Sequence, residues 1–304
     1  MSRILICSVV MSFFGGCALS DSVTTLNTES TDQDVISPNG QSTTGVNPNV
    51  ISPNGPSLSG VTLDGIAPTG RAATGAAITV AASGAPLAGA AVVGSTWTGH
   101  LSDGRELALR IDVASQGTGS NRDVWSYQVS AWTGGAWQSL CVDDAGNPSF
   151  ADSVTGTWNL QQGVPSGGTY KQNARDFTLA CRGSSIAKCV ELGYKPWGGY
   201  EPQLASCVRA LRADYCGDGT SYTVTGTQVN LYDDAGVASD SVDWTVEAAW
   251  TPNGAACVTS AEATRFSQVA HQTPSCWGHG LKAKPSCGDE FNGAQRIVTE
   301  LPPL

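Results

Sequence analysis

Hydrophobic and polar residues alternate along most of this chain from about residue 91 onward, with Gly, Asn and Asp between the alternating segments. The pattern is most regular at Asp123–Trp132, where Trp125, Tyr127, Val129 and Ala131 share one face. Short alternating segments separated by turn residues are typical of a β-meander. The pattern predicts strands at Ser95–His100, Arg105–Val113, Asp123–Trp132, Ala136–Val142, Val154–Leu160, Asp176–Cys181, Tyr222–Val224, Thr227–Tyr232, Val242–Trp250 and Ala255–Ser260.

Two helices are predicted in the middle of this β-rich region. The first, Ile186–Leu192, follows serines that can cap its N-terminus. The second begins at Pro202, a residue favoured in the first turn, and runs to about Ala213. Cys189 and Cys207 lie on the apolar faces of the two helices, so a disulfide between them is geometrically reasonable. The predicted fold class is therefore mostly β (α+β): a β-rich, disulfide-stapled domain with a short two-helix insert.

The N-terminus has the pattern of an export signal. Arg3 precedes the apolar stretch Ile4–Phe14, which is too short to span a bilayer, since a spanning helix needs roughly 20 apolar residues. Gly15 and Gly16 then precede Cys17, as in the lipobox of bacterial lipoproteins, where the cysteine carries the lipid. We expect a lipoprotein signal peptide over residues 1–16 and lipidation of Cys17. The alternative is ordinary secretion with cleavage after Ser20.

The next segment, residues 17–90, is expected to be a flexible, low-complexity tether. No aromatic residue occurs from Gly15 to Thr96, and Ser, Thr, Gly, Pro, Asn and Ala dominate. Such a composition buries too little apolar surface to offset its chain entropy. The alternative is that the last part of Ala72–Val93 forms an edge strand of the globular region, which we place at residues 91–304.

The cysteines predict disulfides. After Cys7 and Cys17 are set aside, eight of the ten cysteines remain, an even number that reads as four bridges in an oxidising compartment, with the connectivity open. Zinc bound by Cys276, Cys287, His271 and His279 is the alternative, but paired Cys-x2-Cys motifs are missing and the chain has three histidines. We therefore expect no metal and no cofactor. The predicted disulfide cysteines are Cys141, Cys181, Cys189, Cys207, Cys216, Cys257, Cys276 and Cys287.

The charge balance argues against nucleic acid as a partner. The formal net charge is −10, only 14% of residues are charged, and no basic patch is visible. Binding to phosphates requires clustered Lys and Arg. We expect contact with the membrane through the N-terminal lipid.

Between about residues 140 and 290 the chain carries several ordered motifs: Ala180–Gly183, Ala187–Val190, Gly193–Trp197, Arg212–Gly219 and Ala249–Cys257. Together these motifs resemble the ADYC domain. The family takes its name from the tetrapeptide found here at Ala213–Cys216, and it occurs in exported proteins of myxobacteria and their relatives. The resemblance implies an extracytoplasmic location but no reaction, because the family has no assigned function.

No catalytic constellation can be assembled from the sequence. Cys216 lies beside Asp214 and Asp218, whose negative charge would raise a thiol pKa, so a half-cystine is favoured over a nucleophile. His271 and His279 lack a serine in a nucleophile-elbow context, and His100 falls at a hairpin.

Asp143-Asp144 and Asp233-Asp234 each precede Ala-Gly. Calcium binding is the minor alternative to ordinary turn chemistry at both pairs.

Aromatic residues offer a second hypothesis, a platform on which sugars stack. For Trp125, Tyr127, Trp132 and Trp137 on neighbouring predicted strands, burial in the core is favoured. Trp197 and Tyr200, in a glycine-rich loop between the helices, are the candidate ligand-binding residues.

Together these features predict an exported lipoprotein of the outer membrane or cell surface, with secretion as the alternative. Its domain is expected to be non-catalytic and to bind a protein or polysaccharide, or to be structural. A secreted hydrolase with a carboxylate-based site and a glycan-binding module are the alternatives.

Overall fold

The computed structural model describes residues 36–39, 63–66, 77–80, 87–101, 106–143, 145–159, 161–172, 177–223, 226–269, 273–288, 291 and 293–303. Cys17 and the predicted signal peptide lie outside the described residues. The described part is mostly β, with two α-helices, as the sequence predicts. None of its helices is long and apolar enough to cross a bilayer.

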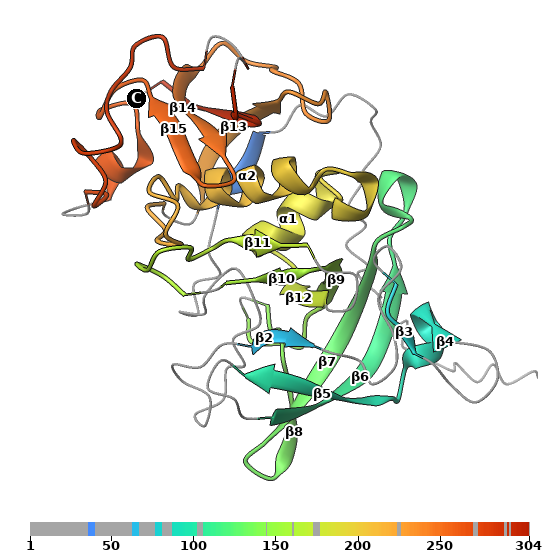
Figure 1. The fold of residues 1–304 in the computed structure, drawn as a ribbon. Helices are drawn as coiled ribbons and strands as arrows, with labels where there is room; N and C mark the ends of the chain where they lie inside the picture. Colours follow the sequence, from blue (N-terminus) through green and yellow to red (C-terminus); the bar gives the residue numbers. More distant parts are fainter. Residues whose placement is uncertain are drawn as a thin grey trace, which may run out of the picture.

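The larger sheet closes into a small antiparallel barrel. β6 pairs with both β5 and β7, so six strands form a ring in the order β6-β5-β2-β12-β9-β7, and β8 extends from β7 (Figure 1). Side chains that alternate along these strands, including Leu109, Val129, Val154 and Leu179, are buried in the core. The strands are β2 (Leu63–Ile66), β5 (Thr96–Leu101), β6 (Glu106–Gln116), β7 (Trp125–Thr133), β8 (Ala136–Ser139), β9 (Ala151–Thr155) and β12 (Phe177–Cys181).

The second sheet has five antiparallel strands in the order β1-β13-β16-β14-β15. They are β1 (Ile36–Asn39), β13 (Thr227–Asp233), β14 (Thr245–Thr251), β15 (Gly254–Val258) and β16 (Ile297–Leu301). Short pairs join β3 (Thr79–Val80) to β4 (Leu87–Ala88) and β10 (Thr157–Trp158) to β11 (Tyr170–Lys171). Single 3-10 turns are η1 (Gly89–Val92), η2 (Gly119–Asn121), η3 (Pro196–Gly198) and η4 (Arg265–Gln268).

The two helices lie between the barrel and the five-stranded sheet. α1 (Ser185–Glu191) packs on β9 and β12 of the barrel, and α2 (Glu201–Arg212) packs on β14, β15 and β16 (Figure 1). Ser184 caps α1 by accepting from the backbone N–H of Ala187 at 3.4 Å. The apolar stripe of α2 is buried as its spacing predicts. The helix pair therefore joins the two sheets through one continuous core.

Three local predictions differ from the structure. Tyr222 is not in a strand, because its backbone N–H donates to the carbonyl of Arg212 at 3.1 Å and so binds this segment to the end of α2. Gly156, with φ +94°, separates β9 from β10 within the predicted strand Val154–Leu160. The central strand β16 has no counterpart among the predicted strands.

The predicted tether, residues 17–90, contains strands β1 and β2, which pair with β13 and with β5 and β12. β1 pairs on one side only, and such an edge position tolerates the missing N–H of Pro38. Most of the remaining segment lies outside the described residues, so for those residues the tether stays a prediction.

Candidate functional site

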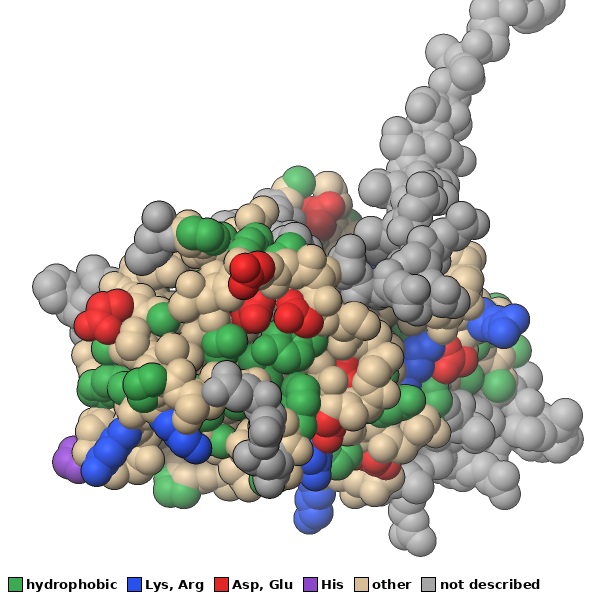
Figure 2. Space-filling view, turned by 90° about the horizontal axis from the view of Figure 1, so that it is seen from above, with side chains coloured by type: hydrophobic (Ala, Val, Ile, Leu, Met, Phe, Trp, Pro, Cys, Tyr) green, Lys and Arg blue, Asp and Glu red, His purple; other side chains and the backbone are tan. Residues whose placement is uncertain are grey.

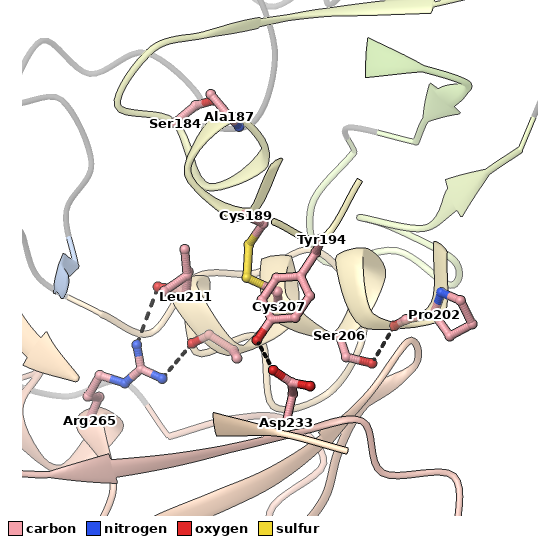
Figure 3. The surroundings of a disulfide bond; sticks show 11 residues. Ser184, Ala187, Cys189, Tyr194, Pro202, Ser206, Cys207, Leu211, Asp233 and Arg265 are labelled. Atoms are coloured by element: carbon pink, nitrogen blue, oxygen red, sulfur yellow. Dashed lines mark hydrogen bonds between the residues drawn. A yellow bond between two sulfur atoms is a disulfide. The ribbon is translucent and has the colours of Figure 1, made fainter. Parts of the chain in front are cut away.

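All eight predicted cysteines form disulfides. The bridges are Cys141–Cys181, Cys189–Cys207, Cys216–Cys276 and Cys257–Cys287. The second confirms the predicted link between the helices, and Figure 3 shows it joining α1 to α2. The sulfurs of Cys276 and Cys287, considered above as zinc ligands, are bonded to other cysteines. In the described part of the chain no three His, Cys, Asp or Glu side chains are arranged to hold a metal.

The tetrapeptide Ala213–Cys216 ends α2 and turns the chain toward the five-stranded sheet. Ala213 adopts the left-handed conformation, with φ 54° and ψ 41°, which is a common way to end a helix. Asp214 follows as a buried carboxylate that forms an ion pair with Arg209. It also accepts hydrogen bonds from the backbone N–H groups of Asp218 at 3.1 Å and Gly219 at 2.8 Å. Asp214 therefore holds the loop after α2 in place.

Tyr215 belongs to a buried polar network under the five-stranded sheet. Its hydroxyl donates to Glu247 Oε1 at 2.5 Å and accepts from the backbone N–H of Arg265 at 2.9 Å. The Arg265 guanidinium pairs with Glu247 at 2.9 Å and donates to the last carbonyls of α2, including that of Leu211 at 3.3 Å (Figure 3). The hydroxyl of Thr299, on β16, also donates to Glu247, at 2.8 Å. One carboxylate thus connects β14, β16, η4 and the tetrapeptide.

The ionisation of this network is set by burial and by pairing. Burial alone would raise the pKa of Glu247, but the Arg265 guanidinium and the hydrogen bonds from Arg265, Tyr215 and Thr299 hold that pKa below its ordinary value. Burial raises the pKa of Tyr215 well above its ordinary value. Both side chains are buried. Their arrangement stabilises a fold and offers no accessible acid or base.

The candidate ligand-binding residues Trp197 and Tyr200 lie in the turn that joins the helices. Both are half-buried and pack against the core. The indole N–H of Trp197 donates to Asp123 Oδ2 at 2.7 Å, and Lys195 pairs with the other oxygen of that carboxylate at 2.5 Å. Trp197 therefore links the turn between the helices to the loop before β7 by a hydrogen bond. Because its ring is half-buried, less of the indole surface is available to a ligand than its position in a loop suggests.

The four strand aromatics divide between the two faces of the barrel wall. Tyr127 is buried and its hydroxyl accepts from the backbone N–H of Ile78 at 3.0 Å, while Trp125 is partly buried. Trp132 points outward and is 46% exposed, so the expectation of burial is wrong for this residue. The side chains of Ala131 and Trp132 lie on opposite faces of β7, and Ala131 occupies the buried face. Trp137 faces it from β8 and is partly buried.

The first aspartate of each Asp-Asp pair accepts hydrogen bonds from the backbone of its own turn. Asp143 accepts from the backbone N–H groups of Ala145 and Asn147 at 3.0 and 2.8 Å. Asp233 accepts from three backbone N–H groups of its own loop and from the Tyr194 hydroxyl at 2.8 Å. Asp144 and His271 lie outside the described residues, as does the side chain of His100, and His279 is exposed.

One pair of carboxyl groups was not anticipated. Asp152, buried on β9, and Glu191, at the end of α1, share the Arg182 guanidinium, with N–O distances of 3.5 and 3.4 Å. Burial, and then the charge of Asp152, raise the pKa of Glu191 to about 7. Raised carboxyl pKa values are common at acid–base sites. Here Asp152 has no contact with solvent, and Ser126 donates to it at 2.6 Å, which is typical of a structural cluster.

Charged side chains are distributed unevenly over the surface. Figure 2 looks onto the end of the molecule formed by the five-stranded sheet, where acidic side chains gather among hydrophobic and uncharged ones and basic side chains lie toward the edges. Asp240 and Glu300 accept from the amide of Asn230 at 2.9 and 2.8 Å on this sheet. The surface charge of this end does not resemble a phosphate-binding surface.

Comparison with known proteins identifies the family. No curated protein and no solved structure is significantly similar to this chain. A family model of the ADYC domain matches residues 89–264. The match covers more than half of the chain, starting at η1 and ending before η4. It includes every barrel strand except β2, both helices, and β13, β14 and β15 of the five-stranded sheet. The chain belongs to the ADYC domain family.

Proposed function

We propose that this chain is an exported, lipid-anchored protein of the bacterial outer membrane or cell surface, in which the ADYC domain is a non-catalytic module that binds an extracellular partner. The observation that supports an extracytoplasmic location is the set of four disulfides, since such bridges persist in oxidising compartments. Gly15-Gly16-Cys17 supplies the proposed attachment point for the lipid.

The non-catalytic assignment is supported by the contacts of the name-giving tetrapeptide. Asp214 is paired with Arg209, Tyr215 with Glu247 and Cys216 with Cys276. Within the tetrapeptide, the side chains of Asp214 and Tyr215 are buried and that of Cys216 is covalently bonded. The tetrapeptide therefore has a structural explanation, and what remains for function is the surface.

Lipidation is tested by expressing the full chain and its Cys17→Ala variant in a bacterium supplied with an alkyne-bearing fatty acid. We expect label on the wild-type chain in the membrane fraction and none on the variant. Treatment with an alkylating reagent should add the mass of eight alkyl groups to the mature chain only after reduction, because eight cysteines are in disulfides. An unlabelled chain in the culture medium would overturn lipid anchoring while leaving export intact.

The alternative of a secreted hydrolase is tested separately. Glu191 is the accessible member of the carboxyl pair, so its substitution by Gln is the informative variant. We expect no release of reducing sugar from xylan, β-glucan or peptidoglycan by the wild-type chain. Release that disappears in Glu191→Gln would overturn the non-catalytic assignment.

A further inference from the structure

The hairpin of β7 and β8 carries two tryptophans at its outer face. Trp132 and Trp137 are direct cross-strand partners, two residues from the Gly134-Gly135 turn, in which both glycines have positive φ. Their rings meet edge to face, with centroids 5.4 Å apart. The hairpin extends from the barrel at the lower end of Figure 1, at a distance from both helices.

Polar groups held in fixed positions adjoin this aromatic pair. The Arg110 guanidinium on β6 lies over the Trp137 ring, 4.6 Å from its centroid. Arg110 Nε pairs with Asp112 Oδ1 at 2.5 Å, and Asp112 Oδ2 accepts from the hydroxyl of Ser130. Ser130 and Trp132 share one face of β7, since side chains two residues apart point the same way. Aromatic surface, a cation and an anion therefore lie side by side on neighbouring strands.

Part of this polar cluster remains available to a ligand. Only the Nε–H of Arg110 forms a hydrogen bond within the described part of the chain, which leaves the terminal N–H groups of the guanidinium as donors. The side chains of Arg110 and Asp112 are 36% and 27% exposed. Mutual pairing restricts the motion of both side chains, so less entropy is lost when a ligand binds.

We infer that this outer face, formed by Arg110, Asp112, Trp132 and Trp137, binds a sugar residue of an extracellular polysaccharide. The inference rests on the proposed function as a binding module and names its ligand class. A pyranose has an apolar C–H face for an indole ring and a rim of hydroxyls that donate to a carboxylate and accept from a guanidinium. Pockets for small ligands combine aromatic surface with a few placed polar groups in the same way.

Other occupants fit this surface less well. A stable protein interface buries about 800 Å² on each partner and centres on a cluster of large apolar side chains. Besides Trp132, the only large hydrophobic residues that the described part of the chain exposes are Val93 and Val113. Edge-to-face contact between the two rings stabilises the hairpin, which explains the geometry of the tryptophans but not the Arg–Asp pair beside them.

The inference is tested by native affinity electrophoresis of the mature full-length chain in gels containing xylan, mixed-linkage β-glucan, galactomannan or soluble peptidoglycan glycan strands. We expect at least one polymer to retard the wild-type chain. Trp132→Thr should weaken binding at least about tenfold, and Trp132→Phe should weaken it much less. Arg110→Met should weaken binding by a factor similar to that of Trp132→Thr, because the guanidinium donors are lost. A tenfold change corresponds to about 1.4 kcal/mol.

The matched control is Trp197→Phe, which alters the half-buried tryptophan of the helix turn. Near-UV circular dichroism and the melting temperature of each variant establish that the fold is kept. Retardation lost in Trp197→Phe but kept in Trp132→Thr would move the site to the helix turn and overturn the inference, as would a wild-type chain that none of the polymers retards. Neither result would change the outcome of the lipid-labelling and thiol-counting experiments, which test the proposed location separately.

Discussion

Removing one oxygen from the tetrapeptide tests whether it stabilises the fold. Tyr215→Phe keeps the buried ring, which contacts Trp250 and Phe266 with centroids 5.1 and 5.2 Å apart. It deletes a hydroxyl that donates to the Glu247 carboxylate at 2.5 Å. The Arg265 N–H that also uses this hydroxyl keeps a second acceptor, Glu247 Oε1 at 3.0 Å, so no backbone donor is left unpaired.

The expected cost follows from those contacts. A hydrogen bond to a charged group contributes about 1.5–3 kcal/mol, and Glu247 keeps its bonds to Arg265 and Thr299. We therefore expect Tyr215→Phe to lower the free energy of unfolding by about 2 kcal/mol. For a domain of this size the melting temperature should fall by roughly 4–8 °C.

The same substitution should change the response to acid. The pKa of Glu247 is lower in the folded chain than its ordinary value of 4.5, so the stability it contributes is present above that value and is lost as the pH falls through the folded pKa. Loss of the Tyr215 hydrogen bond raises the folded pKa. The variant should therefore lose stability at a higher pH than the wild type.

Urea unfolding followed by tryptophan fluorescence, at pH 7 and at steps down to pH 3, measures both effects. Tyr200→Phe is the matched control, since that tyrosine is half-buried and we expect a change below about 0.5 kcal/mol. A Tyr215→Phe variant as stable as this control, with the acid transition of the wild type, would refute the structural reading of the tetrapeptide.

Three further predictions concern other parts of the fold. The pKa of Glu191 is raised from 4.5 to about 7, so its contribution to stability declines as the pH rises between these values, by about 3 kcal/mol at most. In urea unfolding at pH 5 and pH 8, Glu191→Gln should therefore lose less stability between the two pH values than the wild type. An equal loss in both proteins would contradict this prediction. Gly217→Ala should destabilise far more than Gly236→Ala, because both have positive φ but only the first places a Cβ 1.9 Å from a backbone oxygen; equal melting temperatures would contradict the clash. Replacing Cys189 and Cys207 together by Ala should cost about 3 kcal/mol in unfolding free energy, and a loss below about 1 kcal/mol would show that the helices hold together without their bridge.

Much of the architecture is accessible from local sequence patterns. The alternation at Asp123–Trp132 predicts both the strand and its buried face, because a two-residue period is imposed by the backbone itself. The stripe on α2 predicts its buried side for the same kind of reason. β16 carries a local strand signal, since Ile297, Val298 and Thr299 are β-branched, but the turn residues before it interrupt the alternating pattern.

The candidate site was harder to predict than the fold. Trp132 and Trp137 can be recognised in the sequence as aromatic residues of predicted strands, and their size and apolarity predict burial. The alternation that buries Ala131, however, places Trp132 on the solvent-exposed face. Arg110 and Asp112 join them only because β6 pairs with β7. The pair of Asp152 and Glu191 likewise depends on where α1 packs against β9.

The sequence by itself determined the alternation that makes the domain β-rich, the two helices with their buried faces, and an even set of eight cysteines. Those properties depend on neighbours a few residues apart, where backbone geometry leaves few choices. The tertiary structure decided how the six cysteines other than Cys189 and Cys207 pair, that the larger sheet closes between β6 and β7, and which tryptophan faces solvent. Such pairings join residues as distant as Cys216 and Cys276, 60 positions apart, and are selected by packing of the whole core because no local pattern records them.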